Sequence, residues 1–375
     1  MRRIQGRAFV DGAFKDDIVV SFAGGRITDV AHHARGSADA AGGVIVPGFV
    51  DVHVHGGDGA DFMDADDAAT ARVLSFHARH GTTALLATTL SGSTSDLKKA
   101  VESIARVVAS SPRGAEICGV HLEGPYINRK HAGAQDVHSI RPADASELGA
   151  ILAAGPRLRW IVTLAPEIEG ARELIQHYKD RVLFSIGHTS ADYAEAVAGL
   201  GWGASHFTHL FNAMTGMHHR EPGVVGAALG SVDATVELIA DGVHVHPAVL
   251  RITATMLPRR TALVTDAVRA CGMPDGKYKL YGYEIIVADG TARLSDSGTL
   301  AGSLLTMSQA VQNMVELAGL PIELVIPLAT EVPARIAGVA DRKGRLEIGY
   351  DADIVVLSEK FEAARVFARG QEVSR

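Results

Sequence analysis

The stretch that decides the fold reads Pro47-Gly48-Phe49-Val50-Asp51-Val52-His53-Val54-His55-Gly56. Residues 45–54 are rich in β-branched side chains, which predicts one strand buried on both faces. Because side chains alternate along a strand, His53 and His55 are expected to point to the same side near its end. Neutral imidazole is the commonest metal ligand, yet a pair of hydrogen-bonded structural histidines fits so short a motif equally well. The remainder of the chain has to decide between these interpretations.

Composition sets the class of protein. The chain has 375 residues, 47% of them apolar, which suffices for an α/β barrel with additions. A net charge of −7 argues against nucleic acid or an anionic membrane as a partner, because both require a broad basic face. The two cysteines, Cys118 and Cys271, form no CxxC motif, so we expect a reducing cytoplasm. We expect neither a signal peptide nor a membrane span, because no apolar segment of the required length occurs.

The middle of the chain alternates strand-like runs with amphipathic or alanine-rich segments. Eight strands are expected, ending near His55, Thr88, Glu123, residues 163–166, His188, His209, Asp241 and Asp266. Helices are expected at residues 66–80, 97–109, 144–154, 171–179, 191–200 and 246–256. Eight such units predict a (β/α)8 TIM barrel over residues 47–343. A doubly wound sheet is the alternative, and it is disfavoured because it requires no regular count of eight.

Both ends of the chain are predicted to form short strands separated by turns. Strand-like runs lie at residues 7–10, 18–22, 26–30, 344–348, 352–357 and 364–368. Neither end can bury a core alone, so residues 1–46 and 344–375 are expected to combine into a small β-sandwich domain. A turn-rich segment followed by a hairpin-like pattern predicts a lid-like insertion at about residues 270–297, after the eighth strand.

Polar side chains follow most of the predicted barrel strands. In a TIM barrel the carboxyl ends of the strands form the active site. Four histidines and two carboxylates lie at these ends: His53, His55, Glu123, His188, His209 and Asp266. Each alone has an ordinary explanation, such as a helix cap or a backbone hydrogen bond, but six at one rim favour a transition-metal site.

Asp266 has a separate predicted role. A carboxylate beside a metal can take the proton of the attacking water and pass it to a departing amine, which favours hydrolysis of an amide-like bond. Redox iron uses similar ligands and is an alternative on ligand type alone. A metal-binding or sensory barrel without catalysis is another, but pure binding needs no acid/base such as Asp266.

The chain resembles the N-acetylglucosamine-6-phosphate deacetylase family of the metal-dependent amidohydrolase superfamily. The motifs that carry the resemblance occur in the family order: His121-Leu-Glu-Gly-Pro125, Gly187-His-Thr189, Thr208-His-Leu-Phe-Asn-Ala-Met214, Arg220-Glu-Pro-Gly223, Ile239-Ala-Asp-Gly-Val-His244, Val264-Thr-Asp-Ala267 and Gly298-Thr-Leu-Ala-Gly-Ser303. The resemblance implies a hydrolase of linear amides that converts N-acetylglucosamine 6-phosphate to glucosamine 6-phosphate and acetate in amino-sugar catabolism. It also implies a homodimer.

The resemblance assigns roles to individual residues. Glu123, His188 and His209 match the main metal site, and Asp266 matches the general acid/base. The implied cofactor is a divalent metal, zinc or iron, with one or two ions per subunit. His53 and His55 would bind the second ion, with Glu123 as the bridge.

Nine further positions match the family's substrate-binding residues. They are Ala134, Gln135, Asn212, Ala213, Arg220, His244, Leu300, Ala301 and Gly302. Among them, Asn212, Ala213 and Arg220 match positions that bind the phosphate. His244 matches a residue that reaches the partner's site across the dimer interface.

One departure from the family pattern keeps the substrate open. Many relatives carry Lys-Gly-Ala-His after the Glu-Gly-Pro motif, whereas this chain has Lys130-His-Ala-Gly-Ala-Gln135, so Gln135 replaces a sugar-contacting histidine. His131 is nearby but out of register. N-acetylgalactosamine 6-phosphate is therefore an alternative substrate. Another amidohydrolase activity, on a cyclic amide, is a further alternative.

Overall fold

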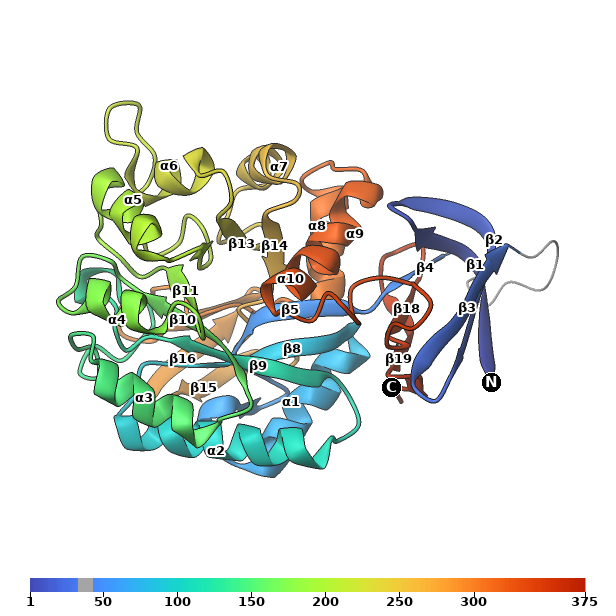
Figure 1. Ribbon diagram of the computed structural model, residues 1–375, viewed down its shortest axis with the longest axis horizontal. Helices are drawn as coiled ribbons and strands as arrows, with labels where there is room; N and C mark the ends of the chain where they lie inside the picture. The colour runs from blue at the N-terminus through green and yellow to red at the C-terminus, as the bar shows by residue number, and fades with distance from the viewer. Residues whose placement is uncertain (33–42, 375) are drawn as a thin grey trace.

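A computed structural model describes residues 1–32 and 43–374. Its largest sheet has eight parallel strands, which follow one another in chain order around a barrel (Figure 1). They are β5 (Phe49–Val54), β8 (Thr82–Thr89), β9 (Glu116–Glu123), β10 (Arg159–Leu164), β11 (Leu183–Ile186), β12 (His206–Phe207), β13 (Thr235–Ile239) and β14 (Thr261–Val264). The barrel closes just beyond the strand ends, where the Asp266 amide donates to the His53 carbonyl at 2.9 Å and the His55 amide to the Ala267 carbonyl at 2.9 Å. The predicted TIM barrel is confirmed.

Helices surround the strands, and the main core lies between the two layers (Figure 1). They are α1 (Asp67–Arg79), α2 (Thr94–Ser110), α3 (Ala145–Ala154), α4 (Ala171–Tyr178), α5 (Tyr193–Trp202), α6 (Gly223–Gly230), α7 (Pro247–Met256), α8 (Met307–Glu316), α9 (Ile322–Ala329) and α10 (Glu331–Ile336). The six predicted helices all occur, and several begin at a side-chain cap, such as Asp66, Ser93 or Asp192. No helix in the described part of the chain is long and apolar enough to cross a membrane.

The two ends of the chain share one seven-stranded sheet, in the order β20-β19-β18-β4-β1-β2-β3. Its strands are β1 (Arg2–Val10), β2 (Ala13–Ala23), β3 (Arg26–His32), β4 (Val44–Pro47), β18 (Ile354–Leu357), β19 (Ala363–Ala368) and β20 (Gln371–Glu372). The rings of Phe22 on β2 and Phe367 on β19 lie 5.2 Å apart although these strands are not neighbours. The sheet therefore folds over its own apolar core as a small sandwich. The exact domain boundaries stay a prediction.

One predicted strand of this sheet is wrong. Residues 344–348 form turns and irregular backbone rather than a strand. Gly344 and Gly349 bracket the segment with φ values of +87° and +89°, which break an extended backbone at both ends. Leu346 alone fills the sandwich core from this segment.

The opening stretch is also not one strand but two. β4 ends at Pro47 in the small sheet and β5 begins at Phe49 in the barrel. Gly48 makes the transition, and a Cβ at this position would lie 2.1 Å from the Thr83 hydroxyl oxygen. Only glycine fits so close to β8, so a single residue connects the small domain to the first barrel strand.

The insertion after β14 forms a three-stranded antiparallel sheet: β15 (Gly276–Leu280), β16 (Tyr283–Ala288) and β17 (Thr291–Leu294). The Tyr281 hydroxyl donates to Asp96 and the Tyr283 hydroxyl to Asp136, both at 3.0 Å. These two bonds hold the insertion against the first turn of α2 and against the loop that carries Asp136. Four short elements complete the part of the chain that the structure describes: β6 (Gly56–Gly57), β7 (Ala60–Asp61), η1 (Phe62–Asp64) and η2 (Arg129–His131).

Candidate metal centre and active site

The six residues predicted from the strand ends come together at one end of the barrel. Five of them line a pocket of about 300 Å³: His55, Glu123, His188, His209 and Asp266. His53 lies immediately beneath and is fully buried. His188, His209 and Asp266 all have left-handed backbones, with φ values of +47°, +30° and +49°. Such strain in residues other than glycine persists only where the surrounding fold enforces it, as at functional sites.

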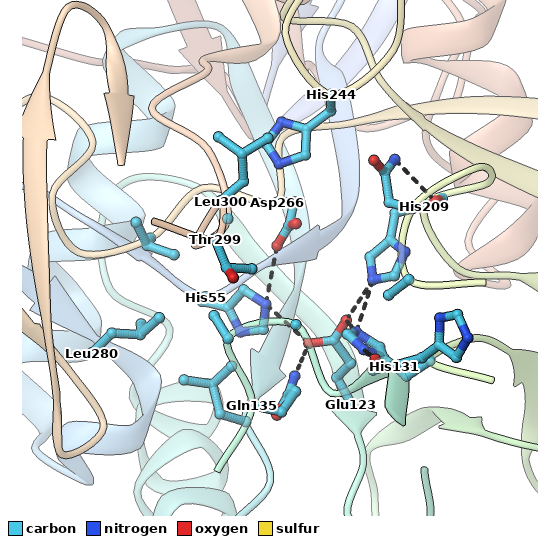
Figure 2. Close-up of a pocket in the computed structure, with 18 of the residues that line it drawn as sticks. His55, Glu123, His131, Gln135, His209, His244, Asp266, Leu280, Thr299 and Leu300 are labelled. Atoms are coloured by element: carbon cyan, nitrogen blue, oxygen red, sulfur yellow. Dashed lines mark hydrogen bonds and ion pairs between the residues drawn. The ribbon is translucent and has the colours of Figure 1, made fainter. Parts of the chain in front are cut away.

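Glu123, at the end of β9, occupies the centre of the cluster (Figure 2). Its Oε1 lies 3.1 Å from Nε2 of both His188 and His209, and these two nitrogens are 3.0 Å apart. His188 donates its Nδ1 proton to the His131 carbonyl at 2.8 Å, which leaves the Nε2 lone pair directed at Glu123. These three residues form one group of candidate metal donors.

A second group shares the same carboxylate. The Nε2 atoms of His53 and His55 lie 3.2 Å apart. The first is 3.3 Å from Oε1 of Glu123 and the second 3.3 Å from its Oε2. Asp266 lies on the other side of this pair, with Oδ1 3.2 Å from His55 Nε2 and 3.5 Å from His53 Nε2. Gln135 donates its side-chain amide to Oε2 of Glu123 (Figure 2).

The donor spacing fits a divalent ion. Metal–nitrogen and metal–oxygen bonds of about 2.1 Å place neighbouring donors about 3.0–3.4 Å apart, and the separations here are 3.0–3.3 Å. Three buried carboxylates, Glu123, Glu237 and Asp266, have only histidines as ion-pair partners within the described residues. A divalent cation bound at these donors would balance that buried negative charge.

The surrounding charges keep the two carboxylates at the pocket ionised. Burial alone would raise the pKa of Glu123, but its close contacts with His53 and His188 outweigh that effect and hold the pKa well below its usual value. Burial also acts to raise the pKa of Asp266, and His53 and His55 together lower it. Asp266 is therefore in the form that accepts a proton.

Most of the predicted substrate positions also face the pocket. Its lining includes Ala134, Gln135, Asn212, Ala213, His244, Leu300 and Gly302. Ala301 is buried between the last two and is not part of the surface. Arg220 lies outside: it is exposed, and its guanidinium contacts the His219 ring at 2.7 Å.

The resemblance implied that His244 reaches a partner's site, whereas the structure places it in the pocket of its own chain. His244 lines its own pocket and points toward Asp266 (Figure 2). Asp241, in the turn after β13, holds the His244 Nδ1 at 2.6 Å. This four-residue turn, Asp241 to His244, fixes the ring on its own barrel, and no sequence motif indicates that orientation.

Several residues of the site were missed by the sequence analysis. Lys130, His131, Leu280 and Thr299 line the pocket, and the first two lie in η2, within the run that departs from the family pattern. Glu237 lies below it in the middle of β13. A charged residue inside a buried strand was the available signal for Glu237.

Comparison with known proteins identifies the family. The Amidohydrolase family model matches residues 44–373. The chain belongs to the amidohydrolase family. This amidohydrolase is 41% identical to N-acetylglucosamine-6-phosphate deacetylase from Bacillus subtilis (strain 168), over 88% of this chain and 84% of that protein. It is 39% identical to N-acetylgalactosamine-6-phosphate deacetylase from Escherichia coli O157:H7, over 88% of each chain. The predicted resemblance is confirmed.

Comparison with solved structures gives the same family. N-acetyl-D-glucosamine-6-phosphate deacetylase from Mycobacterium smegmatis superposes on this amidohydrolase with a TM-score of 0.93 at 36% identity, covering all of both chains. A mutant of that enzyme in complex with N-acetyl-D-glucosamine-6-phosphate gives a TM-score of 0.92, also at 36% identity and full coverage.

Proposed function

We propose that this chain is a metal-dependent deacetylase that hydrolyses the acetamide of N-acetylglucosamine 6-phosphate to glucosamine 6-phosphate and acetate. The observation that carries the proposal is the position of Asp266. It is an ionised carboxylate opposite Glu123, beside a cluster of donors that fits a metal, at the base of a pocket large enough for a sugar. Its similarity to deacetylases of phosphorylated amino sugars supports the substrate class.

Each residue has a defined part in the reaction. Glu123, His188 and His209 would hold a divalent ion. When bound, that ion polarises the amide carbonyl and lowers the pKa of a coordinated water. Asp266 takes the proton of the attacking water and then donates it to the departing amine, so the amino sugar leaves in neutral form. Leu300 and Gly302 line the wall of the pocket beside the sugar.

The second group of donors favours two ions. His53 and His55 add two imidazoles beside the Glu123 carboxylate, His53 at Oε1 and His55 at Oε2, so Glu123 would be shared by both positions. Imidazole and carboxylate together suit zinc or iron better than magnesium. Metal analysis of the purified protein, loaded separately with each metal, tests both the identity and the number.

The phosphate is proposed to lie against Asn212 and Ala213, beside Lys130 and His244. We keep the homodimer, but with Arg220 as the residue that crosses to the partner's phosphate, because Arg220 lies outside its own chain's pocket. The expected cytoplasmic location agrees with Cys118 and Cys271 both being free.

The second candidate is the same reaction on N-acetylgalactosamine 6-phosphate. Gln135 and the 39% identity to an enzyme of that name favour it. Acetate release from both sugar phosphates, from phosphate-free N-acetylglucosamine and from a cyclic amide, with defined metals, separates the candidates. Equal rates with and without the phosphate would refute both sugar-phosphate proposals, and turnover of the cyclic amide alone would replace them.

A further inference from the structure

Glu237 is a completely buried carboxylate that the proposed reaction does not use. It lies in the middle of β13, among Val236, Leu238 and Ile239, on the layer just below the metal donors. A buried charge in a barrel core is costly unless every lone pair is satisfied. Its retention there requires an explanation beyond packing.

The contacts of Glu237 are specific. Oε2 accepts the Nδ1 proton of His53 at 2.9 Å and the backbone amide of His209 at 2.9 Å. Oε1 accepts the Nε2 proton of His206 at 3.0 Å. One carboxylate therefore contacts a candidate ligand from each donor group, one through its ring and the other through its backbone.

The bond to His53 determines what the other side of that ring can do. A carboxylate only accepts, so His53 must carry its proton on Nδ1. The Nε2 lone pair then points toward His55 and Glu123, 3.2 and 3.3 Å away. A carboxylate behind an imidazole fixes the tautomer and the ring orientation and makes the ligand a stronger base.

The neighbouring histidine does not share this arrangement. His121 donates its Nδ1 proton to the Val52 carbonyl at 3.0 Å, and its Nε2 is 2.7 Å from the Thr163 hydroxyl. Both of its nitrogens are engaged within the barrel core, so His121 is not directed at the metal donors. Glu237 therefore bonds the rings of two histidines, His53 and His206, and of these only His53 belongs to a donor group that includes Glu123.

We propose that Glu237 is the positioning residue for the second metal position: it holds His53 in the tautomer and orientation that bind an ion together with His55 and Glu123. This inference rests on the proposed metal site. The occupancy of that second position, and not the existence of the site, is what Glu237 controls.

Equilibrium dialysis with zinc followed by metal analysis tests the proposal on E237Q, which keeps the size of the side chain and removes its charge. Losing such a partner weakens metal binding by about 10- to 100-fold. We expect that loss for the second ion, while the first binds within about threefold of wild type. T235V is the matched control, because the Thr235 hydroxyl contacts the far side of His206 at 2.7 Å and the Ser205 carbonyl at 3.4 Å, neither of which is a metal donor. It should bind both ions normally.

A double-mutant cycle separates positioning from general stability. If Glu237 acts through His53, E237Q adds no further loss of zinc affinity in an H53A background. An equal loss in both backgrounds, or two normal affinities in E237Q, would overturn the proposal.

Wild-type protein gives an independent readout should E237Q fail to fold. In zinc-loaded protein with ¹⁵N-labelled histidine, the His53 ring should show its proton on Nδ1, and a proton on Nε2 would overturn the proposal. These measurements use no substrate. A chain that binds two ions in this way but releases no acetate refutes the proposed reaction alone.

Discussion

Replacement of Asp266 by asparagine is the most direct test of the proposed chemistry. The side chain keeps its size, and Asp266 contacts His53 and His55 but neither His188 nor His209. At least one metal ion per chain should therefore stay bound. Only the capacity to take and return a proton is lost. Proton transfer by a positioned group contributes about 10²–10⁴-fold, which corresponds to about 3–5 kcal/mol in the activation free energy.

The assay is acetate release from N-acetylglucosamine 6-phosphate, with metal content measured on the same samples. We expect kcat of D266N to fall by at least about 10²-fold. Because the pKa of Asp266 is held below its usual value, the wild-type base stays ionised, and the deficit should persist at every pH above that value. D64N is a suitable control, since Asp64 pairs with Arg269 outside the pocket at 2.6 Å. A D266N variant with full metal and a near-normal kcat would refute the mechanism.

Three further predictions follow from the contacts. Q135L removes the donor to Glu123 and leaves the backbone amide of Ser91 without its acceptor. The free energy of unfolding measured by chemical denaturation should therefore fall by about 1–3 kcal/mol, and metal affinity should weaken. Unchanged values of both would contradict this prediction. Burial would raise the pKa of Glu116, but Arg342 and Lys343 lower it to about 2. The ionised carboxylate therefore adds about 3 kcal/mol to the free energy of unfolding above pH 4.5, and this contribution is lost as the pH falls toward 2. E116Q should flatten that part of the stability curve, and an identical curve would disprove the pairing. Mixing inactive R220M with inactive D266N should restore part of the activity, since a hybrid dimer contains one complete pocket; no recovery in confirmed hybrids would show that Arg220 does not act across the interface.

The sequence predicted those parts of the site that lie at strand ends. An apolar run followed by a histidine or a carboxylate is a local pattern, and it placed Glu123, His188, His209 and Asp266 correctly at the mouth of the barrel. The same pattern could not identify Glu237, because this residue lies in the middle of β13 and not at its end, and its contacts lie inside the core.

The sequence also could not predict which way individual side chains point. His244 and Arg220 were assigned by resemblance, and only the turn at Asp241 determines that His244 faces its own pocket. α6 was missed because Gly223–Gly230 is apolar on all sides and shows no helical period. The division of residues 45–54 between two sheets depends on the proximity of Gly48 to Thr83, which is a tertiary contact and leaves no trace in the local pattern.

The left-handed backbones of His188, His209 and Asp266 carry a consequence for the evolution of the enzyme. Strained residues of this kind cost roughly 1–3 kcal/mol each, so the barrel folds despite the conformations that its active residues adopt. A metal that binds only the folded chain offsets this deficit. Glycine at any of the three positions should make the metal-free protein more stable and the enzyme inactive, which is a trade-off between stability and activity. Selection for thermal stability alone would therefore remove the residues that make the barrel an enzyme.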